Sequence, residues 1–230
     1  MIKGIVIYFQ EYKEYDALIH ILTKEEIVPC IAKGVLKINS KNKGAVQLFS
    51  YSEFEFVDDQ KTMKVLKHAK LLDSFYSLRN DLNKQTCALY MCECIDKAHI
   101  CCFDLLYASL KHLQDELYSA LCLFQACFNK MIGVLAYVDG CVCCNSESNI
   151  IALSIKEGGF VCGSCKKEMI VDDLEFLKLF RIYSKADFIH FPLLKKQYPA
   201  NKKIWQYLYA FLSDYSGLTI KTANFLNQIL

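Results

Sequence analysis

The chain has little proline and glycine, one tryptophan and almost no net charge. Its 230 residues include 3 Pro, 9 Gly and 1 Trp, which excludes collagen-like and low-complexity classes. With 53% hydrophobic and 23% charged residues, the chain can bury a core, so global disorder is excluded as well. The 27 Lys+Arg against 25 Asp+Glu leave a net charge of +2. This total does not by itself indicate a general nucleic-acid binder.

The sequence also lacks the common motifs of nucleotide-binding and hydrolytic enzymes. It contains no P-loop, no G-x-G-x-x-G, no H-E-x-x-H and no G-x-S-x-G. No histidine begins the H-x-E of a zinc deaminase. Nothing in the sequence therefore favours an enzyme, and we expect a non-enzymatic protein.

Two further segments indicate neither export nor a membrane span. Residues 1–9 hold one lysine and a short apolar run before a charged stretch at 11–16, which is unlike a secretory signal. We therefore expect reduced thiols in a cytosol. The longest apolar stretch, residues 117–138, contains Gln125, Asn129 and Lys130 on one side of a helix. A buried helix with a narrow polar stripe fits this pattern better than a lipid-facing span.

The first seventy or so residues predict five short strands. Residues 53–56 alternate Glu and Phe with a period of two, typical of a half-buried strand. Asp58, Asp59 and Gln60 predict a turn. Five short strands favour a small closed or partly open β-barrel, of which the oligonucleotide-binding (OB) type is one candidate, although a strand count leaves the topology open. The expected strands are 4–9, 18–23, 27–36, 46–57 and 63–72.

From residue 78 the hydrophobic period becomes that of helices. Asp81 is a candidate N-cap for a first helix, and Asp172 or Asp173 for a later one. Pro192 and Pro199 indicate a connection. The expected helices are 81–97, 104–112, 115–137, about 173–183, 200–213 and 221–229.

Two Cys-x-x-Cys pairs predict a structural zinc site. Cys141 and Cys144 are separated by 17 residues from Cys162 and Cys165, inside the range of a four-thiolate site. Each pair forms a tight turn that directs two thiolates at one point, and four protein ligands leave no open position for a substrate. A hairpin signal at residues 157–159 lies between the pairs. We therefore expect one structural zinc ion per chain, held by a ribbon insert at about residues 139–167.

The 13 cysteines leave alternatives open. Cys143 could replace either neighbour as a ligand, and a second site around Cys94, His99, Cys101 and Cys102 is conceivable. Most of the remaining cysteines lie among apolar helical residues, where cysteine behaves as a small buried hydrophobe. Asn145, directly after the first pair, is the residue best tolerated after glycine in a left-handed conformation.

The near-neutral total conceals two basic segments without acidic residues. Residues 28–50 hold Lys33, Lys37, Lys41 and Lys43, and residues 188–213 hold Lys195, Lys196, Lys202 and Lys203. Lysines on a loop beside a β-barrel can follow a phosphate backbone, with nearby Tyr12, Phe49 and Tyr51 as candidates for base stacking. A solvated loop with ordinary surface lysines is the alternative, and charge alone does not decide between them.

Taken together, these segments resemble the RecO family of bacterial DNA repair proteins over most of the chain. Asn145, where the family usually has glycine, and the additional cysteines depart from its pattern. The resemblance lies in Gly4-Ile5-Val6, Tyr12-Lys13-Glu14-Tyr15-Asp16 and Leu22-Thr23; in Ala32-Lys33-Gly34 with Lys37, Ser40, Lys41 and Gly44; in Leu78-Arg79-Asn80-Asp81-Leu82; in Cys141-Val142-Cys143-Cys144, Gly158-Gly159 and Cys162-Gly163-Ser164-Cys165; and in Leu212, Gly217-Leu218, Lys221, Phe225 and Leu226.

The resemblance implies an α+β chain: an N-terminal five-stranded OB-type β-barrel at 1–75, then an α-helical domain at 76–230 carrying the four-cysteine zinc ribbon. It implies a cytoplasmic, nucleoid-associated recombination mediator that binds single- and double-stranded DNA and anneals complementary strands. Implied partners are RecR, the C-terminal tail of single-strand-binding protein (SSB), RecF and RecA. Lys33, Lys37 and Lys41 would contact phosphate by resemblance, and Lys43 by charge and position. A zinc-containing protein-interaction adaptor that binds no nucleic acid is the alternative.

Overall fold

The computed structural model describes residues 1–57 and 63–230. Its contacts group into two compact units: Met1–Gln114 together with Ile220–Leu230, and Asp115–Thr219. The turn expected at residues 58–60 lies outside the described residues. The sequence predicts a boundary between a barrel domain and a helical domain at residues 75 and 76. The contact grouping divides the chain elsewhere and does not test this boundary, which stays a prediction.

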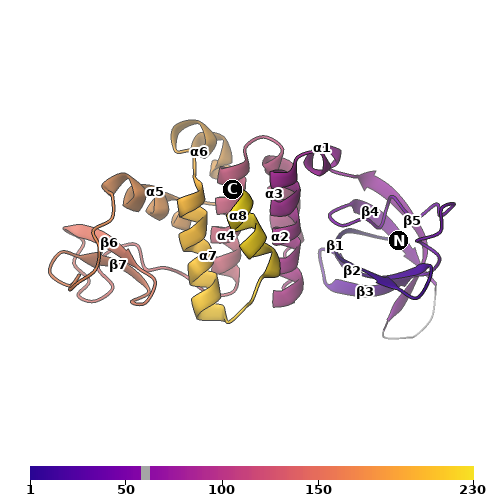
Figure 1. Cartoon of the computed structure of the whole chain (residues 1–230), viewed down its shortest axis with the longest axis horizontal. Helices are drawn as coiled ribbons and strands as arrows, with labels where there is room; N and C mark the ends of the chain where they lie inside the picture. The colour runs from indigo at the N-terminus through magenta and orange to yellow at the C-terminus, as the bar shows by residue number, and fades with distance from the viewer. Residues whose placement is uncertain (58–62) are drawn as a thin grey trace. The chain divides into compact units, whose positions relative to one another are not determined.

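The first unit begins with a closed five-stranded barrel (Figure 1). The strands follow the order β1-β2-β3-β5-β4, in which β3 and β5 pair in parallel and the other neighbours pair antiparallel. This confirms the expected OB-type barrel. The strands are β1 (Ile2–Tyr12), β2 (Asp16–Leu22), β3 (Ile27–Ala32), β4 (Tyr51–Phe56) and β5 (Lys64–Asp73).

Alternation along the strands fills the barrel. In β3 every second residue is buried, and Cys30 and Ala32 point into the same core as Ile19 and Phe54. Because side chains alternate across a strand, the residues between them face outward. The expected strand at 27–36 ends at Ala32, and residues 33–50 continue as a series of turns.

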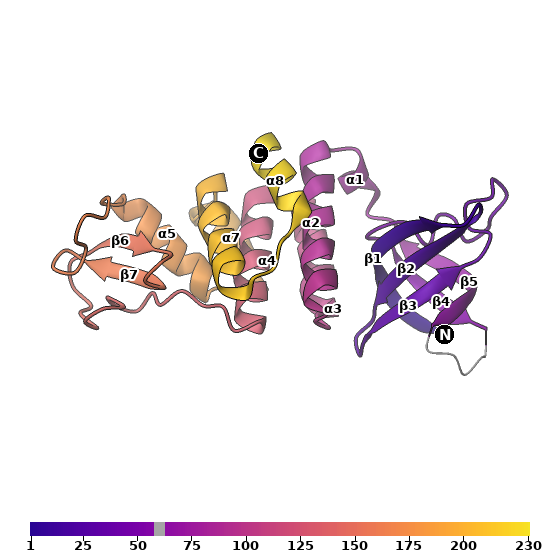
Figure 2. The same cartoon turned by 60° about the horizontal axis from the view of Figure 1, so that its bottom comes forward.

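Four helices of the described residues belong to the same unit. Asp81 caps α2, because its carboxylate accepts hydrogen bonds from the backbone N–H groups of Asn83 and Lys84. The last helix, α8, lies beside α2 although more than a hundred residues separate them (Figure 2). The helices are α1 (Tyr76–Arg79), α2 (Leu82–Ala98), α3 (Phe103–Leu113) and α8 (Lys221–Ile229).

The second unit packs helices around α4, which lies beside α7 (Figures 1 and 2). Two residues of the expected polar stripe of α4 are buried: Gln125 donates to Asn129 at 2.7 Å, and Asn129 donates to the Leu208 carbonyl at 2.8 Å. The third, Lys130, is half-buried and donates to the Ala186 carbonyl at 2.9 Å. The helix ends before the expected residue 137, since Gly133 adopts a left-handed backbone (φ +75°). The unit contains α4 (Leu117–Met131), β6 (Ile150–Ser154), β7 (Gly159–Cys162), α5 (Leu174–Lys185), the short 3-10 turn Phe188–His190, α6 (Phe191–Gln197) and α7 (Lys202–Ser216).

Helix α6 stands where the two prolines indicated a connection. Pro192 lies in its first turn, where the missing N–H of proline costs nothing. Asp173, rather than Asp172, caps α5 by accepting from Phe176 N at 3.1 Å. Within the described residues, no helix combines the length and apolar character needed to cross a membrane.

Candidate metal centre and basic surface

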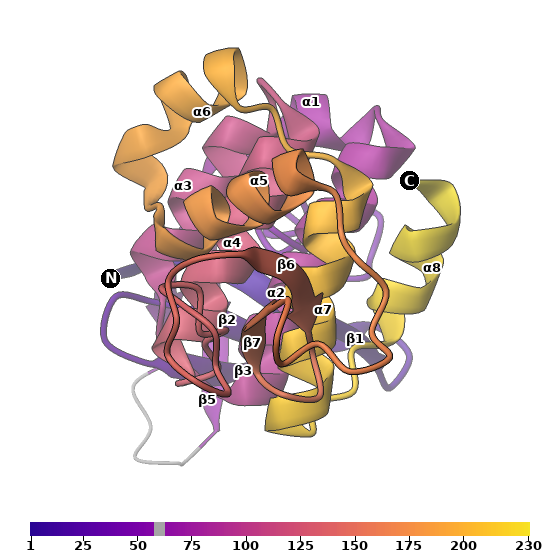
Figure 3. The same ribbon diagram turned by 90° about the vertical axis from the view of Figure 1, so that its left-hand side faces the viewer.

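The cysteine pairs lie at one end of the β6–β7 hairpin. In Figure 3 this hairpin faces the viewer. The two strands pair antiparallel, with Ile150 opposite Cys162 and Ser154 opposite Gly159, as the hairpin signal predicted. At the turn, the Tyr215 hydroxyl from α7 donates to the Ile155 carbonyl at 2.7 Å. The hairpin is therefore attached to the helices of its own unit.

The other edge of the hairpin is held by Tyr137. Its backbone N–H donates to the Gly158 carbonyl at 2.9 Å, and its carbonyl accepts from Phe160 N at 2.8 Å. The segment leading to the first cysteine pair is thus joined to β7, which leads to the second. Local hydrogen bonding therefore brings the two pairs together.

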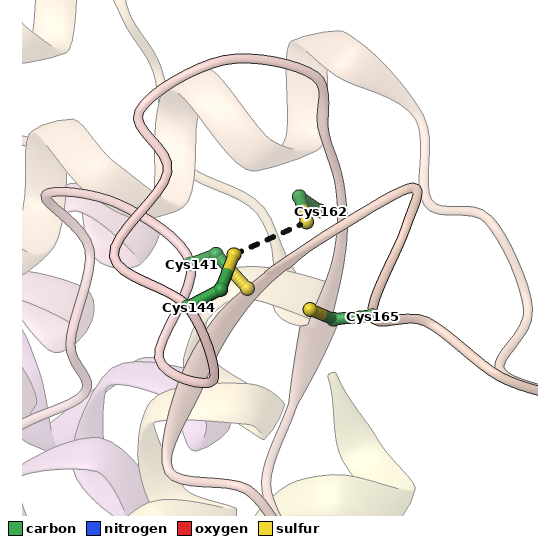
Figure 4. A group of neighbouring side chains, drawn as sticks. All are labelled: Cys141, Cys144, Cys162 and Cys165. Carbon is green, nitrogen blue, oxygen red and sulfur yellow. Dashed lines mark hydrogen bonds between the residues drawn. The ribbon is translucent and has the colours of Figure 1, made fainter.

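The four expected ligands converge on one point. The ligand atoms of Cys141, Cys144, Cys162 and Cys165 all lie within 4.8 Å of one another. Figure 4 shows their sulfurs directed at a common centre, with Cys144 Sγ and Cys162 Sγ 3.7 Å apart. Four sulfurs at about 2.3 Å from a tetrahedral zinc ion would lie about 3.8 Å apart. The group therefore has the dimensions of a tetrathiolate site, whereas a disulfide needs sulfurs at about 2.0 Å.

Two tight turns position the thiols. The Cys141 carbonyl accepts from Asn145 N at 2.8 Å, and the Cys162 carbonyl accepts from Cys165 N at 3.1 Å. Asn145 has φ +59°, which confirms the expected left-handed conformation and explains why asparagine can stand where the turn favours glycine.

The thiols differ in acidity. Burial raises the pKa of Cys141, but backbone N–H groups of Cys162, Cys143 and Cys144 outweigh burial and lower it to about 6. Hydrogen bonds with Cys144 and Cys162 raise the pKa of Cys165 to about 12. The surroundings thus favour one thiolate in the group. Its negative charge then opposes deprotonation of a second thiol. A divalent cation at the centre would remove this conflict, because metal binding releases the remaining thiol protons.

The arrangement suits a structural rather than a catalytic metal. All four positions are protein sulfurs, so no coordination position is left for water or substrate. Cys143 is exposed and lies outside the group, which leaves Cys144 as the second ligand of its pair. Within the described residues, Cys94, His99, Cys101 and Cys102 do not form a second metal-binding group.

The remaining cysteines are mostly core residues, as expected. Burial raises the pKa of the Cys30 and Cys102 thiols to about 12, so both stay neutral. None of the 13 cysteines forms a disulfide. The buried members are Cys30, Cys87, Cys92, Cys94, Cys102 and Cys122.

The basic loop, residues 33–50, closes one part of the barrel surface. Its apolar residues Val35, Ala45 and Val46 are buried in the barrel core. Its polar Asn42 accepts from Ala69 N at 3.0 Å and thereby ties the loop to β5. Asp16 accepts from Gly34 N at 2.7 Å. The loop is therefore anchored through its apolar and amide side chains, and its lysines are left outside.

All four lysines of the loop, Lys33, Lys37, Lys41 and Lys43, are exposed. None of them forms an ion pair with another described residue. The structure brings Lys33 and Lys37 together at one shallow hollow and places Lys43 at another. The first hollow also includes Lys13, Glu14 and Tyr15 of the β1–β2 turn and Asp16 at the start of β2, so it holds acidic as well as basic side chains. Sequence reasoning did not place Lys13 and Tyr15 beside the basic loop, because only the pairing of the strands brings the turn there.

The expected stacking residues have different environments. Tyr12 is exposed. Phe49 is buried beneath the Arg79 guanidinium, which lies 4.1 Å from its ring centre, so Phe49 cannot stack on a base. Tyr51 packs against Tyr107, with ring centres 5.3 Å apart.

The second basic segment is partly neutralised. Lys195 lies 3.4 Å from an Asp115 carboxylate oxygen, and Lys203 lies 3.6 Å from Asp172. A hollow of about 650 Å³ lies in the same unit. Its lining mixes charged and apolar side chains, and the Arg181 guanidinium lies 3.1 Å from an Asp139 carboxylate oxygen. The lining residues are Glu175, Lys178, Leu179, Arg181, Ile182, Gln197, Tyr198 and Pro199.

Two family models of known proteins match the N-terminal and the C-terminal parts of the chain. The family model described as "Recombination protein O N terminal" matches residues 1–75, and "Recombination protein O C terminal" matches residues 79–223. The DNA repair protein RecO of Bacillus pumilus (strain SAFR-032) is 27% identical over 239 residues, covering 99% of this chain and 93% of that protein.

Two further relatives extend this similarity. Proteins with the same name from Halalkalibacterium halodurans and Bacillus mycoides are each 24% identical, covering 99% of this chain and 94% and 96% of their own lengths. Since the two family models match residues 1–75 and 79–223, the chain belongs to the RecO family of DNA repair proteins.

Proposed function

We propose that this protein is a non-enzymatic recombination mediator that binds single- and double-stranded DNA and anneals complementary strands. The observation that carries the proposal is the basic loop, which presents four exposed lysines without ion-pair partners among the described residues of an OB-type barrel. Positive side chains beside such a barrel follow the phosphate backbone of a strand. Membership of a DNA repair family supports the same conclusion.

The lysines act by displacing cations from the DNA. Each of Lys33, Lys37, Lys41 and Lys43 neutralises one phosphate and releases counterions, so binding weakens as salt rises. The contact is independent of base sequence, as a mediator acting on any damaged region requires. Annealing follows when phosphate repulsion between two complementary strands is reduced on one protein surface.

The four-cysteine group holds one zinc ion with a structural role. Thiolate ligands in a tetrahedral group of this size suit zinc. The core around the ligands is small, with Cys141, Val161 and Cys162 as its fully buried members. Phe160 packs beside Phe180 of α5 and attaches β7 to the helices. The core around the ligands is too small to hold the two cysteine turns together by itself, so the metal contributes much of the stability of this end of the ribbon.

Protein partners follow from the proposed role. Together with RecR, and with RecF as a further partner, the protein helps to load RecA onto strands coated with SSB. The acidic, aromatic-ended SSB tail would bind at this hollow beside Lys178, where Leu179 and Tyr198 offer apolar contact. Glu175 and the Asp139 partner of Arg181 reduce the positive charge there, so apolar contact supplies much of the binding. Tyr198 follows Lys195 and Lys196 of the second basic segment. Acting on chromosomal DNA, the protein would work in the bacterial cytoplasm, at the nucleoid.

A binding and annealing assay at several salt concentrations tests the proposal. With four phosphate contacts, the logarithm of the affinity for single strands should fall against the logarithm of salt with a slope of about −3. Complementary oligonucleotides should anneal faster with the protein than without it. Salt-independent binding, or no DNA binding at all, would contradict the proposal and favour the adaptor function.

A further inference from the structure

A hollow of about 330 Å³ lies within the first unit, beside the basic loop. It is lined by Phe9 of β1, Val46 and Leu48 after the lysines, and Leu89 of α2. Its volume falls within the range of small-ligand sites, about 300–1,000 Å³. Lys43 belongs both to the hollow and to the basic loop, so the two surfaces are continuous.

The charged groups at this hollow are cationic. Lys43 and Arg79 line it, and no carboxylate of the described residues does. The Arg79 guanidinium donates to the carbonyls of Ser74 and Leu48 at 3.0 and 2.7 Å, and it lies over the Phe49 ring. Arg79 is thus a fixed cationic wall, while Lys43 is exposed at the loop. Such a site attracts a ligand that carries negative charge next to an apolar part.

Phe9 offers an aromatic surface inside the hollow. Its side chain is half-buried and packs against the barrel core, and its ring makes no ring contact with another described residue. The ring of Phe49, in contrast, is covered by Arg79. Stacking of a base on an aromatic side chain stabilises single-stranded complexes with little dependence on sequence.

Two side-chain amides complete the lining. Gln47 and Gln85 also line the hollow, and neither carboxamide forms a hydrogen bond with another described residue. Each carboxamide offers donors and an acceptor. Base edges also combine donors and acceptors, whereas the carboxylates of an acidic peptide only accept. The lining therefore suits the edge of a nucleobase, which can use both the donors and the acceptor of a carboxamide.

We infer that this hollow receives one nucleobase from a single strand whose backbone follows the basic loop. The inference rests on the proposed DNA-binding function and adds a site to it. Phe9 stacks on the base, Gln47 and Gln85 bind its edge, and Lys43 contacts the adjoining phosphate. A paired base would first have to leave its duplex, which costs free energy. The hollow therefore favours single strands over duplex DNA.

Binding to strands with and without bases tests the inference. Fluorescence anisotropy of the full chain compares a thymidine strand of about 12 nucleotides with an abasic strand of equal length and phosphate number. We expect the wild type to bind the thymidine strand about tenfold more tightly. Phe9→Leu, which keeps apolar volume but removes the ring, should bring the ratio close to one without changing affinity for the abasic strand. Gln85→Ala should lower the ratio in the same direction.

Matched controls separate this site from general DNA binding. Gln228→Ala, at an exposed glutamine of α8, should keep the wild-type ratio. Lys33→Ala with Lys37→Ala should weaken binding to both strands equally. Because Phe9 lies on a barrel strand, circular dichroism must show that Phe9→Leu is folded. If this variant is unfolded, Gln85→Ala, at a partly exposed position, provides the test instead.

Four outcomes would overturn the inference. Equal wild-type affinity for both strands would remove the base site while leaving the proposed function intact, whereas absence of binding to either strand would contradict both. An unchanged ratio in folded Gln85→Ala and Phe9→Leu would also contradict it. If an acidic peptide ending in phenylalanine binds the wild type but not Phe9→Leu, with no change in the DNA ratio, the hollow belongs to a peptide.

Discussion

At the residue scale, Gly159 lies where the ribbon touches Tyr137 and leaves no space for a side chain. A Cβ added there would lie 2.9 Å from the backbone nitrogen of Tyr137 and closer still to its carbonyl oxygen. Gly159→Ala must therefore push two hydrogen-bonded segments apart. We expect it to lower the free energy of unfolding by about 1–3 kcal/mol and to weaken metal retention, since β7 leads directly to Cys162.

Thermal denaturation and metal content measure this effect. Gly44→Ala is the matched control, because no atom lies within 4 Å of the added Cβ, and its change should stay within about 0.5 kcal/mol. Equal stability of the two variants would show that the Tyr137 contact does not constrain the ribbon.

Individual residues differ in how far the sequence could predict them. The positive φ of Asn145 follows from its place after the cysteine pair, and the structure confirms it. The choice between Cys143 and Cys144 depends on side-chain direction, which spacing does not give. Phe49 was wrong as a stacking residue because Arg79, thirty residues later, covers its ring. Asn42 escaped notice since its partner lies on β5.

At the scale of elements, one side chain attaches α8 to α2. The Glu93 carboxylate accepts from the backbone N–H groups of Lys221 and Thr222, both at 2.9 Å, and from the Thr222 hydroxyl at 2.8 Å. Glu93 therefore caps α8, whose own N-cap residue, Ile220, has no side-chain acceptor. Burial raises the pKa of Glu93, but these hydrogen bonds outweigh burial and hold it below its ordinary value.

Glu93→Gln should destabilise the protein by about 1–2 kcal/mol at neutral pH, because an amide is a weaker cap than a carboxylate. Because the pKa of Glu93 is lower in the folded than in the unfolded protein, its carboxylate contributes its full stabilisation at pH values above the unfolded pKa of about 4.3. This contribution is lost as the pH falls through the lower folded-state pKa. The difference in melting temperature between wild type and variant should therefore shrink in acid. Glu11→Gln, at an exposed residue of β1, should show no difference, and a gap that persists in acid would contradict the role of the charge.

The ribbon should depend on its metal. Protein purified without chelator should contain about one zinc ion per chain. Because Cys144 is exposed and Cys165 partly so, a strong chelator can reach the site, and its removal of zinc should lower the melting temperature. Cys162→Ser should lose the metal, whereas Cys143→Ser should keep it. Stability that is unaffected by Cys162→Ser, with no zinc in the wild type, would contradict the metal centre.

Elements were predictable where local pattern determines them. Both α2 and α8 lie within a residue or two of their expected positions, because capping and hydrophobic spacing are local properties. The order of the strands was not predictable, since the parallel pairing of β3 with β5 joins segments that no turn connects. Helix α6 is not predictable from its prolines, because Pro192 and Pro199 indicate a connection, whereas proline is also well tolerated in a first turn.

At the scale of the whole molecule, local patterns leave the grouping of elements undetermined. Residues 220–230 pack with the unit that contains the barrel, and periodicity carries no information about such distant contacts. The net charge of +2 has a similar limitation. It sums basic and acidic segments that act on different surfaces, so the position of the lysines matters more than their total.

A comparison of two variants with the same net charge tests this conclusion. Lys33→Ala with Lys37→Ala removes two charges from the basic loop, and Lys195→Ala with Lys196→Ala removes two from the second segment. If the loop binds DNA, only the first pair should reduce the salt slope, from about −3 to about −1.5. The second pair should leave DNA affinity unchanged. Equal losses of DNA affinity in both variants would mean that total charge governs binding, and the loop would then not be a defined site.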